Sequence, residues 1–145
     1  LNASNLHHAF FNRYSTIGLA DSKASPCKES IAQITQLHNN LPEWLRSMNP
    51  LVQNNKCVLR FDNDSKIIAV GQNISNICGL SMTRLSMDNA AQVEDMFIEC
   101  ALPNLLCNRN SEFIMTSVPS GGYFNLACQG RTKIVWNVHR TGAVH

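Results

Sequence analysis

The chain has 145 residues, of which 44% are hydrophobic and 15% are charged, and its formal net charge is +2. This length predicts a single domain, and the apolar content excludes general disorder. The basic residues are scattered, which argues against direct contact of this domain with nucleic acid. No apolar run approaches the roughly 18 residues of a membrane span, so no membrane association is expected.

The cysteines indicate a reducing environment. They are widely and irregularly spaced, unlike the dense frameworks of small secreted domains, and several lie within apolar runs, as small buried hydrophobes do. We therefore expect reduced, mostly buried thiols and a cytoplasmic protein. Without a Cys-x-x-Cys pair, no metal site is predicted. The six are Cys27, Cys57, Cys78, Cys100, Cys107 and Cys128.

Residues 1–49 predict mainly helix, with a short helix over residues 6–14 and a longer one that starts near Ser25-Pro26. Ser can accept a bond from the first N–H groups of a helix, and Pro suits its first turn. An apolar stripe runs along this helix from Ile31 to Met48, with a break at Pro42, which lacks an N–H. The stripe is wider than one sheet edge requires, so we expect it to hold a homodimer together.

Residues 57–79 predict a β-hairpin followed by a short helix. The apolar runs at 58–61 and 67–70 are separated by turn-forming Asp, Asn and Ser residues, which is typical of a hairpin. Ile74, Ile77 and Cys78 then share one helix face. Gly79 follows where a helix end favours a residue with positive φ.

The remainder predicts helices and then strands. Residues 80–106 have helical periodicity, and residues 112–118, 123–129 and 132–140 predict three strands joined by Gly-rich turns. Groups of strands separated from groups of helices indicate an α+β fold.

The hairpin region resembles the opening of a PAS domain. Many PAS domains have an Asp at the end of the first strand, a turn, a basic residue followed by Ile, and a helix that ends in Gly. Asp62, Lys66, Ile67 and Gly79 occupy these positions here without a gap. The pattern departs from the family at Ser65, where Gly is usual. The resemblance covers roughly residues 50–140.

This resemblance implies a five-stranded antiparallel sheet with helices on one face, formed by residues 50–145, and an N-terminal helical extension, residues 1–49, that dimerises. It also implies a bacterial signalling protein, not an enzyme, in which this domain binds a small ligand or partner and controls a fused transcription regulator or histidine kinase. In this interpretation, the candidate ligand-binding residues are Phe61, Phe97, Phe113, Met115, Tyr123, Asn125 and Trp136.

Other interpretations remain open at this point. No cofactor is required, although some PAS domains carry haem, for which His38 and His139 are candidate axial ligands. The domain could instead be a dimerisation module with a filled core and no ligand. A third alternative is a small thiol-dependent enzyme based on Cys128 and His139, which would need to lie within hydrogen-bonding reach of each other. No other catalytic constellation is apparent.

Overall fold

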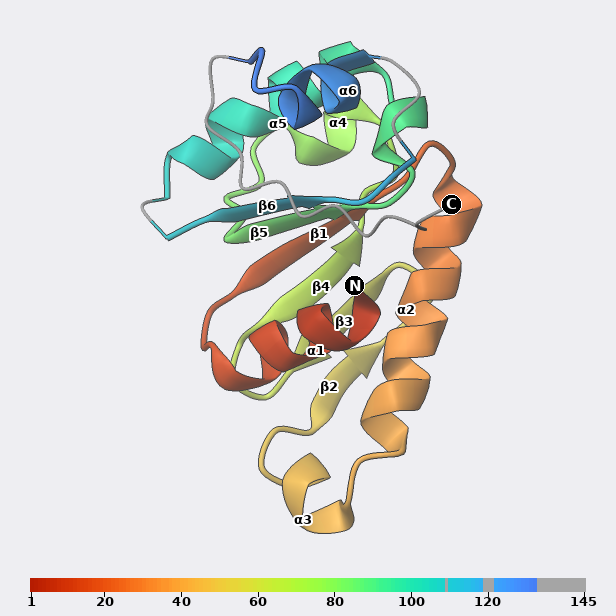
Figure 1. The fold of residues 1–145 in the computed structure, drawn as a ribbon. Helices are drawn as coiled ribbons and strands as arrows, with labels where there is room; N and C mark the ends of the chain where they lie inside the picture. Colours follow the sequence, from red (N-terminus) through yellow and green to blue (C-terminus); the bar gives the residue numbers. More distant parts are fainter. Residues whose placement is uncertain (109, 119–121, 133–145) are drawn as a thin grey trace.

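The structure, a computed structural model, describes residues 1–108, 110–118 and 122–132, and shows a six-stranded mixed sheet with helices on both faces (Figure 1). The strand order is β2-β3-β4-β1-β5-β6. The strands are β1 (Thr16–Ala20), β2 (Leu51–Asn54), β3 (Val58–Phe61), β4 (Lys66–Ala69), β5 (Arg84–Met87) and β6 (Glu112–Met115). The helices are α1 (Asn2–Phe11), α2 (Ala24–Asn39), α3 (Glu43–Arg46), α4 (Ile74–Ile77), the 3-10 helix η1 (Ala90–Gln92), α5 (Asp95–Leu106) and α6 (Gly122–Cys128).

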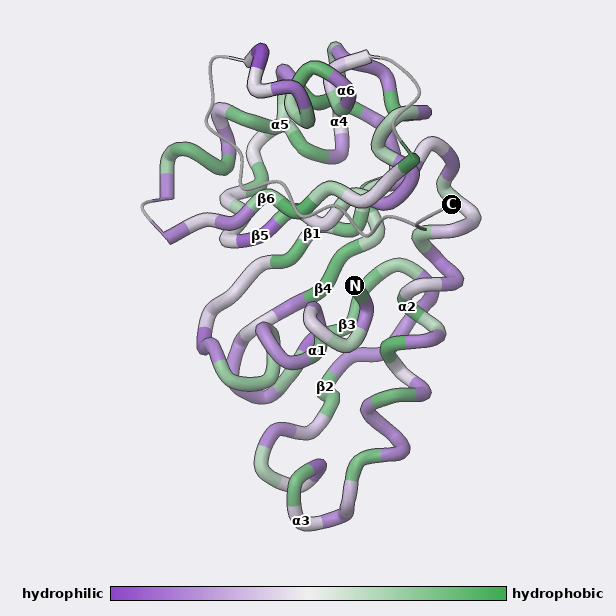
Figure 2. Tube along the Cα trace, in the orientation of Figure 1, coloured by the Kyte–Doolittle hydropathy of each residue, from purple (hydrophilic) through white to green (hydrophobic). Residues whose placement is uncertain are grey.

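Strand β1 lies at the centre of the sheet. It pairs in parallel with β4 on one side and with β5 on the other, and β6 extends the parallel part beyond β5. All five of its residues are buried, as is usual for parallel strands covered on both faces. Strands β2, β3 and β4 form an antiparallel meander on the other side. Figure 2 shows that apolar residues lie along β1 and β4.

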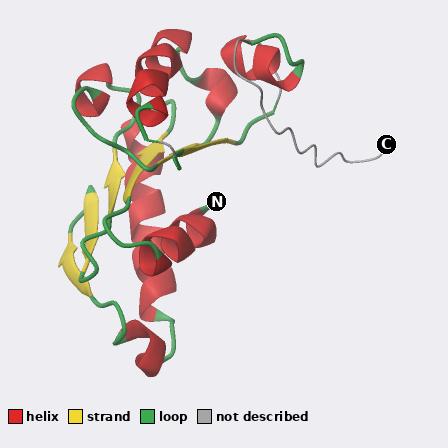
Figure 3. Cartoon of the chain, turned by 90° about the vertical axis from the view of Figure 1, so that its left-hand side faces the viewer, coloured by secondary structure: helices red, strands yellow, loops and turns green. Residues whose placement is uncertain are grey.

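The two faces of the sheet carry separate cores. On one face, α1 and α2 pack against each other and against β1 and β4 (Figure 3). Ile17 and Leu19 of β1 point to this side, where they meet Ile31 and Ile34 of α2. On the other face, α4, α5 and α6 cover a second apolar cluster that includes Leu85, Met87, Phe97, Ile98 and Phe124. Because successive side chains of a strand point to opposite faces of the sheet, the strands contribute residues to both cores.

The expected fold class is therefore wrong. The sheet has six strands rather than five, its central pairings are parallel, and helices cover both of its faces instead of one. Residues 1–49 contribute β1, the central strand, in addition to α1, α2 and α3. Among the described residues, no helix is both long enough and apolar enough to cross a bilayer.

Several local predictions are confirmed. The hairpin is formed by β3 and β4, the short helix is α4, and Gly79 has a φ of 82°. The long N-terminal helix is interrupted before Pro42, and α3 begins directly after it.

Two segments differ in type from the prediction. Residues 84–87 form the buried strand β5 within a stretch expected to be helical. Residues 122–128 form helix α6 instead of a strand, because Phe124 and Ala127 are buried together on one helical face. The third expected strand, residues 132–140, lies almost wholly outside the described residues. All six cysteines are free thiols, but only Cys27 is buried, and Cys57, Cys78 and Cys107 are exposed.

We expect Phe97→Ala to destabilise the protein by roughly 3–5 kcal/mol, because Phe97 is 1% exposed and its removal leaves a cavity between α5 and the sheet. Its neighbour Met96 is 60% exposed, so Met96→Ala should change the free energy of unfolding by less than about 0.5 kcal/mol. Denaturant unfolding of both variants measures the difference. Equal losses would contradict the described packing of α5.

Candidate functional site

Polar residues follow three neighbouring parallel strands at the same edge of the sheet. Ala20 pairs with Met87, and Met87 pairs with Met115, so the last residues of β1, β5 and β6 form one row. The residue directly after each strand is polar: Asp21 follows β1, Asp88 follows β5 and Thr116 follows β6. The backbone bonds from Asp88 N to Ala20 O (3.0 Å) and from Thr116 N to Met87 O (2.9 Å) continue the row. Two carboxylates and a hydroxyl thus line one edge.

This edge includes a topological switch point. After β1 the chain runs to α2 on one face of the sheet, and after β5 it runs through η1 to α5 on the other face. Adjacent loops that leave in opposite directions open a crevice beyond the carboxyl ends of the strands, and open α/β sheets bind their ligands in such crevices. Asp21 and Asp88 stand on the two sides of it.

Asp21 connects the two sides. It is 4% exposed, and its Oδ2 accepts a hydrogen bond from Nδ2 of Asn89 (3.0 Å). Its Oδ1 accepts from Ser22 Oγ (3.0 Å) and from the backbone N–H of Lys23 (3.4 Å). Both carboxylate oxygens therefore have partners, as a buried carboxylate requires. This residue fixes the loop after β1 to the loop after β5.

Asp88 is exposed, in contrast to Asp21. Its Oδ1 accepts from Thr116 Oγ1 (2.7 Å) and from the backbone N–H of Asn89 (3.0 Å). Within the described part of the chain, no hydrogen bond is made to its Oδ2. Thr116 thus holds the orientation of the Asp88 carboxylate, and the second oxygen, Oδ2, points outward.

The first turns of two helices complete a narrow hollow at this edge. Leu1 and Asn2 at the start of α1 line it, together with three residues of the first turns of α2 and with Asp21, Ser86 and Asp88. Among the described residues, no side chain caps the N-terminus of α2, so backbone N–H groups of its first turn remain for another acceptor. Cys27, which also lines the hollow, has its thiol pKa raised to about 11 by burial. It is therefore not a reactive thiolate.

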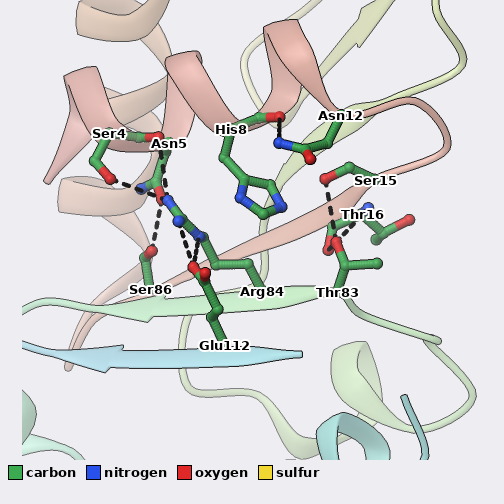
Figure 4. A network of polar contacts seen from close by, with 10 residues as sticks. All are labelled: Ser4, Asn5, His8, Asn12, Ser15, Thr16, Thr83, Arg84, Ser86 and Glu112. Carbon is green, nitrogen blue, oxygen red and sulfur yellow. Dashed lines mark hydrogen bonds and ion pairs between the residues drawn. The ribbon is translucent and has the colours of Figure 1, made fainter. Parts of the chain in front are cut away.

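A polar cluster around the buried Arg84 holds α1 in this position (Figure 4). Arg84 of β5, 7% exposed, donates to the Glu112 carboxylate of β6 and, through Nη1, to Ser4 O and Ser4 Oγ of α1 (3.1 Å each). Ser86 Oγ donates to Asn5 Oδ1 (2.7 Å). These contacts join α1 to the same strand that ends at Asp88. The start of the helix is thereby kept beside the carboxylate.

The predicted ligand-binding residues do not converge on one cavity. Phe97, Phe113, Met115 and Tyr123 lie together on the side of α4, α5 and α6, as core residues or packed against that core. Phe61 lies across the sheet in the other core. Asn125 is on α6, where its Oδ1 accepts from Gln129 (3.4 Å), and Trp136 is outside the described residues. Whether any of them binds a ligand stays a prediction.

The alternative sites can also be located. His38 is 3% exposed, its Nε2 lies 3.3 Å from Asn49 O, and the rings of Phe10 and Phe61 flank it. This is the environment of a packed core histidine. Cys128 is at the end of α6, and His139 lies outside the described residues. Among the described residues, no group of three or more His, Cys, Asp or Glu side chains is arranged to hold a metal ion.

The sequence interpretation missed the residues at this edge. Asp21, Asp88, Asn89 and Thr116 are brought together by pairings between segments 68 or 28 residues apart. A signal is present, because Asp21 directly follows an apolar run and Asp88 follows the alternating residues Arg84 to Met87. It is hidden at Asp88 by the helical periodicity of residues 80–106, which masks the strand at 84–87.

Comparisons with solved structures show a fold similar to that of phage large terminases. Neither a family model nor a curated protein matches the sequence. Solved structures do resemble the chain, namely the large terminase ATPase domain of Thermus phage P74-26, with a TM-score of 0.68, 12% identity, and coverage of 88% of this chain and 57% of that one. The large terminase of another thermophilic bacteriophage, in complex with ADP, gives a TM-score of 0.66, 9% identity, and coverage of 90% and 34%. The same terminase with ATP-γ-S gives 0.56, 10%, and 90% and 33%.

These similarities overturn the PAS resemblance. The neighbours are phage large terminases and a terminase ATPase domain, and the present chain, with its mixed sheet, matches them over 88% and 90% of its length. The expected sensory and signalling function, and the expectation that the domain belongs to no enzyme class, are therefore wrong. The chain spans less than two thirds of the length of each of these structures. At this level of identity, the similarity establishes the fold alone.

The residues at the crevice fit the metal of a magnesium nucleotide better than they fit a phosphate loop. Mg²⁺ is usually held by one or two carboxylates together with substrate phosphates and water, and Asp88 offers such an oxygen at the end of a buried strand. By contrast, no glycine in the sequence is followed by Lys, so the Gly-x-x-x-x-Gly-Lys cradle is absent from these 145 residues. The N-terminus of α2 is the group that could approach phosphates.

We expect stability to fall as the pH is lowered below the ordinary His pKa of 6.5, in part because of His8. Burial lowers the pKa of His8, and so do the positive charges of Arg84 and His7, while Glu112 acts in the opposite direction. The folded state therefore binds this proton less readily than the unfolded state, and the loss grows until the folded-state pKa is passed. In His8→Gln, the decrease in unfolding free energy between about pH 7 and pH 5 should be smaller. Denaturant unfolding at several pH values measures it, and an unchanged pH dependence would contradict this role.

Proposed function

We propose that this chain is part of a large-terminase-type ATPase and binds a magnesium nucleoside triphosphate at the carboxyl edge of β1, β5 and β6. The observation that carries the proposal is the alignment of Asp21, Asp88 and Thr116 one residue beyond the paired row Ala20–Met87–Met115, beside the start of α2, which no side chain of the described residues caps. The solved neighbours with ADP and ATP-γ-S support the choice of ligand.

Asp88 is the proposed metal-binding residue. Its Oδ2 is directed away from the bonds that Thr116 and the Asn89 N–H make to Oδ1, so it can bind Mg²⁺ directly or through a water. An Asp at the end of a strand has this function in P-loop nucleotide-binding proteins. The metal, when bound, neutralises charge on the β- and γ-phosphates. Thr116 keeps the carboxylate oriented, and the buried Asp21 is too fully bonded to act as a second ligand.

The phosphates would meet the start of α2. No side chain among the described residues caps the first turn of α2, and a helix N-terminus attracts anions through its free N–H groups and through its dipole. Lys23 precedes α2, is exposed, and carries a positive charge next to Asp21. It can balance part of the phosphate charge, as a lysine does at other phosphate sites.

The variant Asp88→Asn tests the proposal. Loss of a charge-assisted contact of about 1.5–3 kcal/mol should weaken the binding of Mg-ATP-γ-S by roughly 10- to 100-fold. Isothermal titration calorimetry with and without Mg²⁺ measures it, and the difference between the proteins should disappear when EDTA removes the metal.

The matched control is Asp62→Asn. Asp62 is an exposed carboxylate in the turn between β3 and β4, away from the crevice, so this variant changes the net charge equally without touching the site. It should bind like the wild type. Absence of any magnesium-dependent binding by the wild-type chain, or equal losses in both variants, would refute the proposed site.

A further inference from the structure

We infer that Asn89 orients the water that attacks the γ-phosphate, and that Asp21 is the residue that positions Asn89. This inference rests on the proposed nucleotide site. It concerns a different step, because binding of the nucleotide requires Asp88 and the start of α2, whereas hydrolysis also requires a group that directs water. An amide side chain fulfils this purpose in some phosphate-hydrolysing proteins.

The hydrogen bonds fix the orientation of the Asn89 amide. Its Nδ2 donates to Asp21 Oδ2 at 3.0 Å. A carboxylate only accepts hydrogen bonds, so a flipped amide would place two acceptor oxygens against each other. The oxygen Oδ1 must therefore lie on the side away from Asp21. Since Asn89 is exposed, this oxygen can accept a hydrogen bond from a water beside the metal-binding Asp88.

The backbone also places this side chain in a particular direction. Asn89 has a φ of 51° and a ψ of 38°, the left-handed region, which Asn tolerates better than most residues. The chain turns here immediately after Asp88, because Ala90 N then bonds to Thr116 O (3.1 Å) at the end of β6. Without this turn, the amide would continue the direction of β5 and could not reach Asp21.

Asp21 can hold the amide because it is itself immobile. It is 4% exposed and bonded through Oδ1 to Ser22 and to the Lys23 backbone. The buried carboxylate of Asp21 therefore orients the Asn89 amide, and the amide oxygen orients the water. Preorganised polar groups of this kind contribute to catalysis because they need not rearrange during the reaction.

The proposed step is hydrolysis at the γ-phosphorus. The water oxygen forms a bond to phosphorus, and the bond from phosphorus to the β,γ-bridging oxygen breaks, so that ADP leaves with the electron pair. The water donates a hydrogen bond to Asn89 Oδ1 during the attack. Its proton passes to an oxygen of the new inorganic phosphate, which then equilibrates with solvent. Asn89 neither gains nor loses a proton overall.

The variant Asn89→Gly separates this function from folding, because Gly favours the same left-handed backbone while the amide is removed. In steady-state phosphate release from Mg-ATP, kcat should fall by roughly a hundredfold, the low end of the effect of removing one preorganised hydrogen-bonding group. The KM should stay within about a factor of two, since the interaction is made in the transition state. Asp21→Asn should lower kcat as well, and the double variant should be no slower than Asn89→Gly alone.

Asn40→Ala is the control, because Asn40 is an exposed Asn at the far end of α2, and its kcat and KM should equal those of the wild type. Wild-type kcat in Asn89→Gly would overturn the inference, as would additive losses in the double variant. Binding of Mg-ATP-γ-S by the wild type without any phosphate release would also overturn it and would leave the nucleotide site intact. Absence of binding would instead refute the proposed function.

Discussion

Strand β1 is the element on which the rest of the structure depends. It is paired in parallel on both edges and buried on both faces, so its residues must be small or apolar and must pack without gaps. Gly18 shows how tightly this is enforced, because a Cβ atom there would lie 2.8 Å from Met82 Sδ and 3.0 Å from Leu85 Cδ1. Added volume at the centre of the strand would therefore require the side chains of Met82 and Leu85 to move. The strand can thus hold the residue that follows it, Asp21, at a fixed place.

The polar cluster on the other end of β5 serves the same arrangement. Arg84 would be costly to bury without partners, and Glu112 and Ser4 provide them from the neighbouring strand and from α1. Asn5 is fully buried and accepts a bond from Ser86. Directional bonds of this kind fix the helix along its axis more closely than apolar contacts do. The start of α1 is consequently held at the crevice.

Local order can be predicted from this sequence, whereas long-range order cannot. The hairpin, the short helix that precedes Gly79, and the break at Pro42 each depend on residues within a few positions of one another, and these predictions are confirmed. Strand β1 is buried on both faces and lacks the alternation that marks a half-exposed strand, and the alternation in β5, from Arg84 to Met87, spans only four residues. Without these two strands the sequence predicts an antiparallel sheet, in which Asp21, Asp88 and Asn89 are not neighbours. The resemblance to PAS domains rests on the hairpin, a unit that many folds share.

The central position of β1 has a consequence for the order of folding. The β3–β4 hairpin closes over a short turn and can form within about 1–10 µs. The contacts between β1 and the segment that leads into β5 join residues 67 positions apart. The chain must therefore lose the conformational entropy of closing a long loop before these contacts can stabilise it. The centre of the sheet should therefore assemble after its antiparallel edge, and the crevice should acquire its shape only in the last stage of folding. Until then, the apolar β1 segment is without its parallel partners, and in this interval the chain is most exposed to pairing with strands of other molecules.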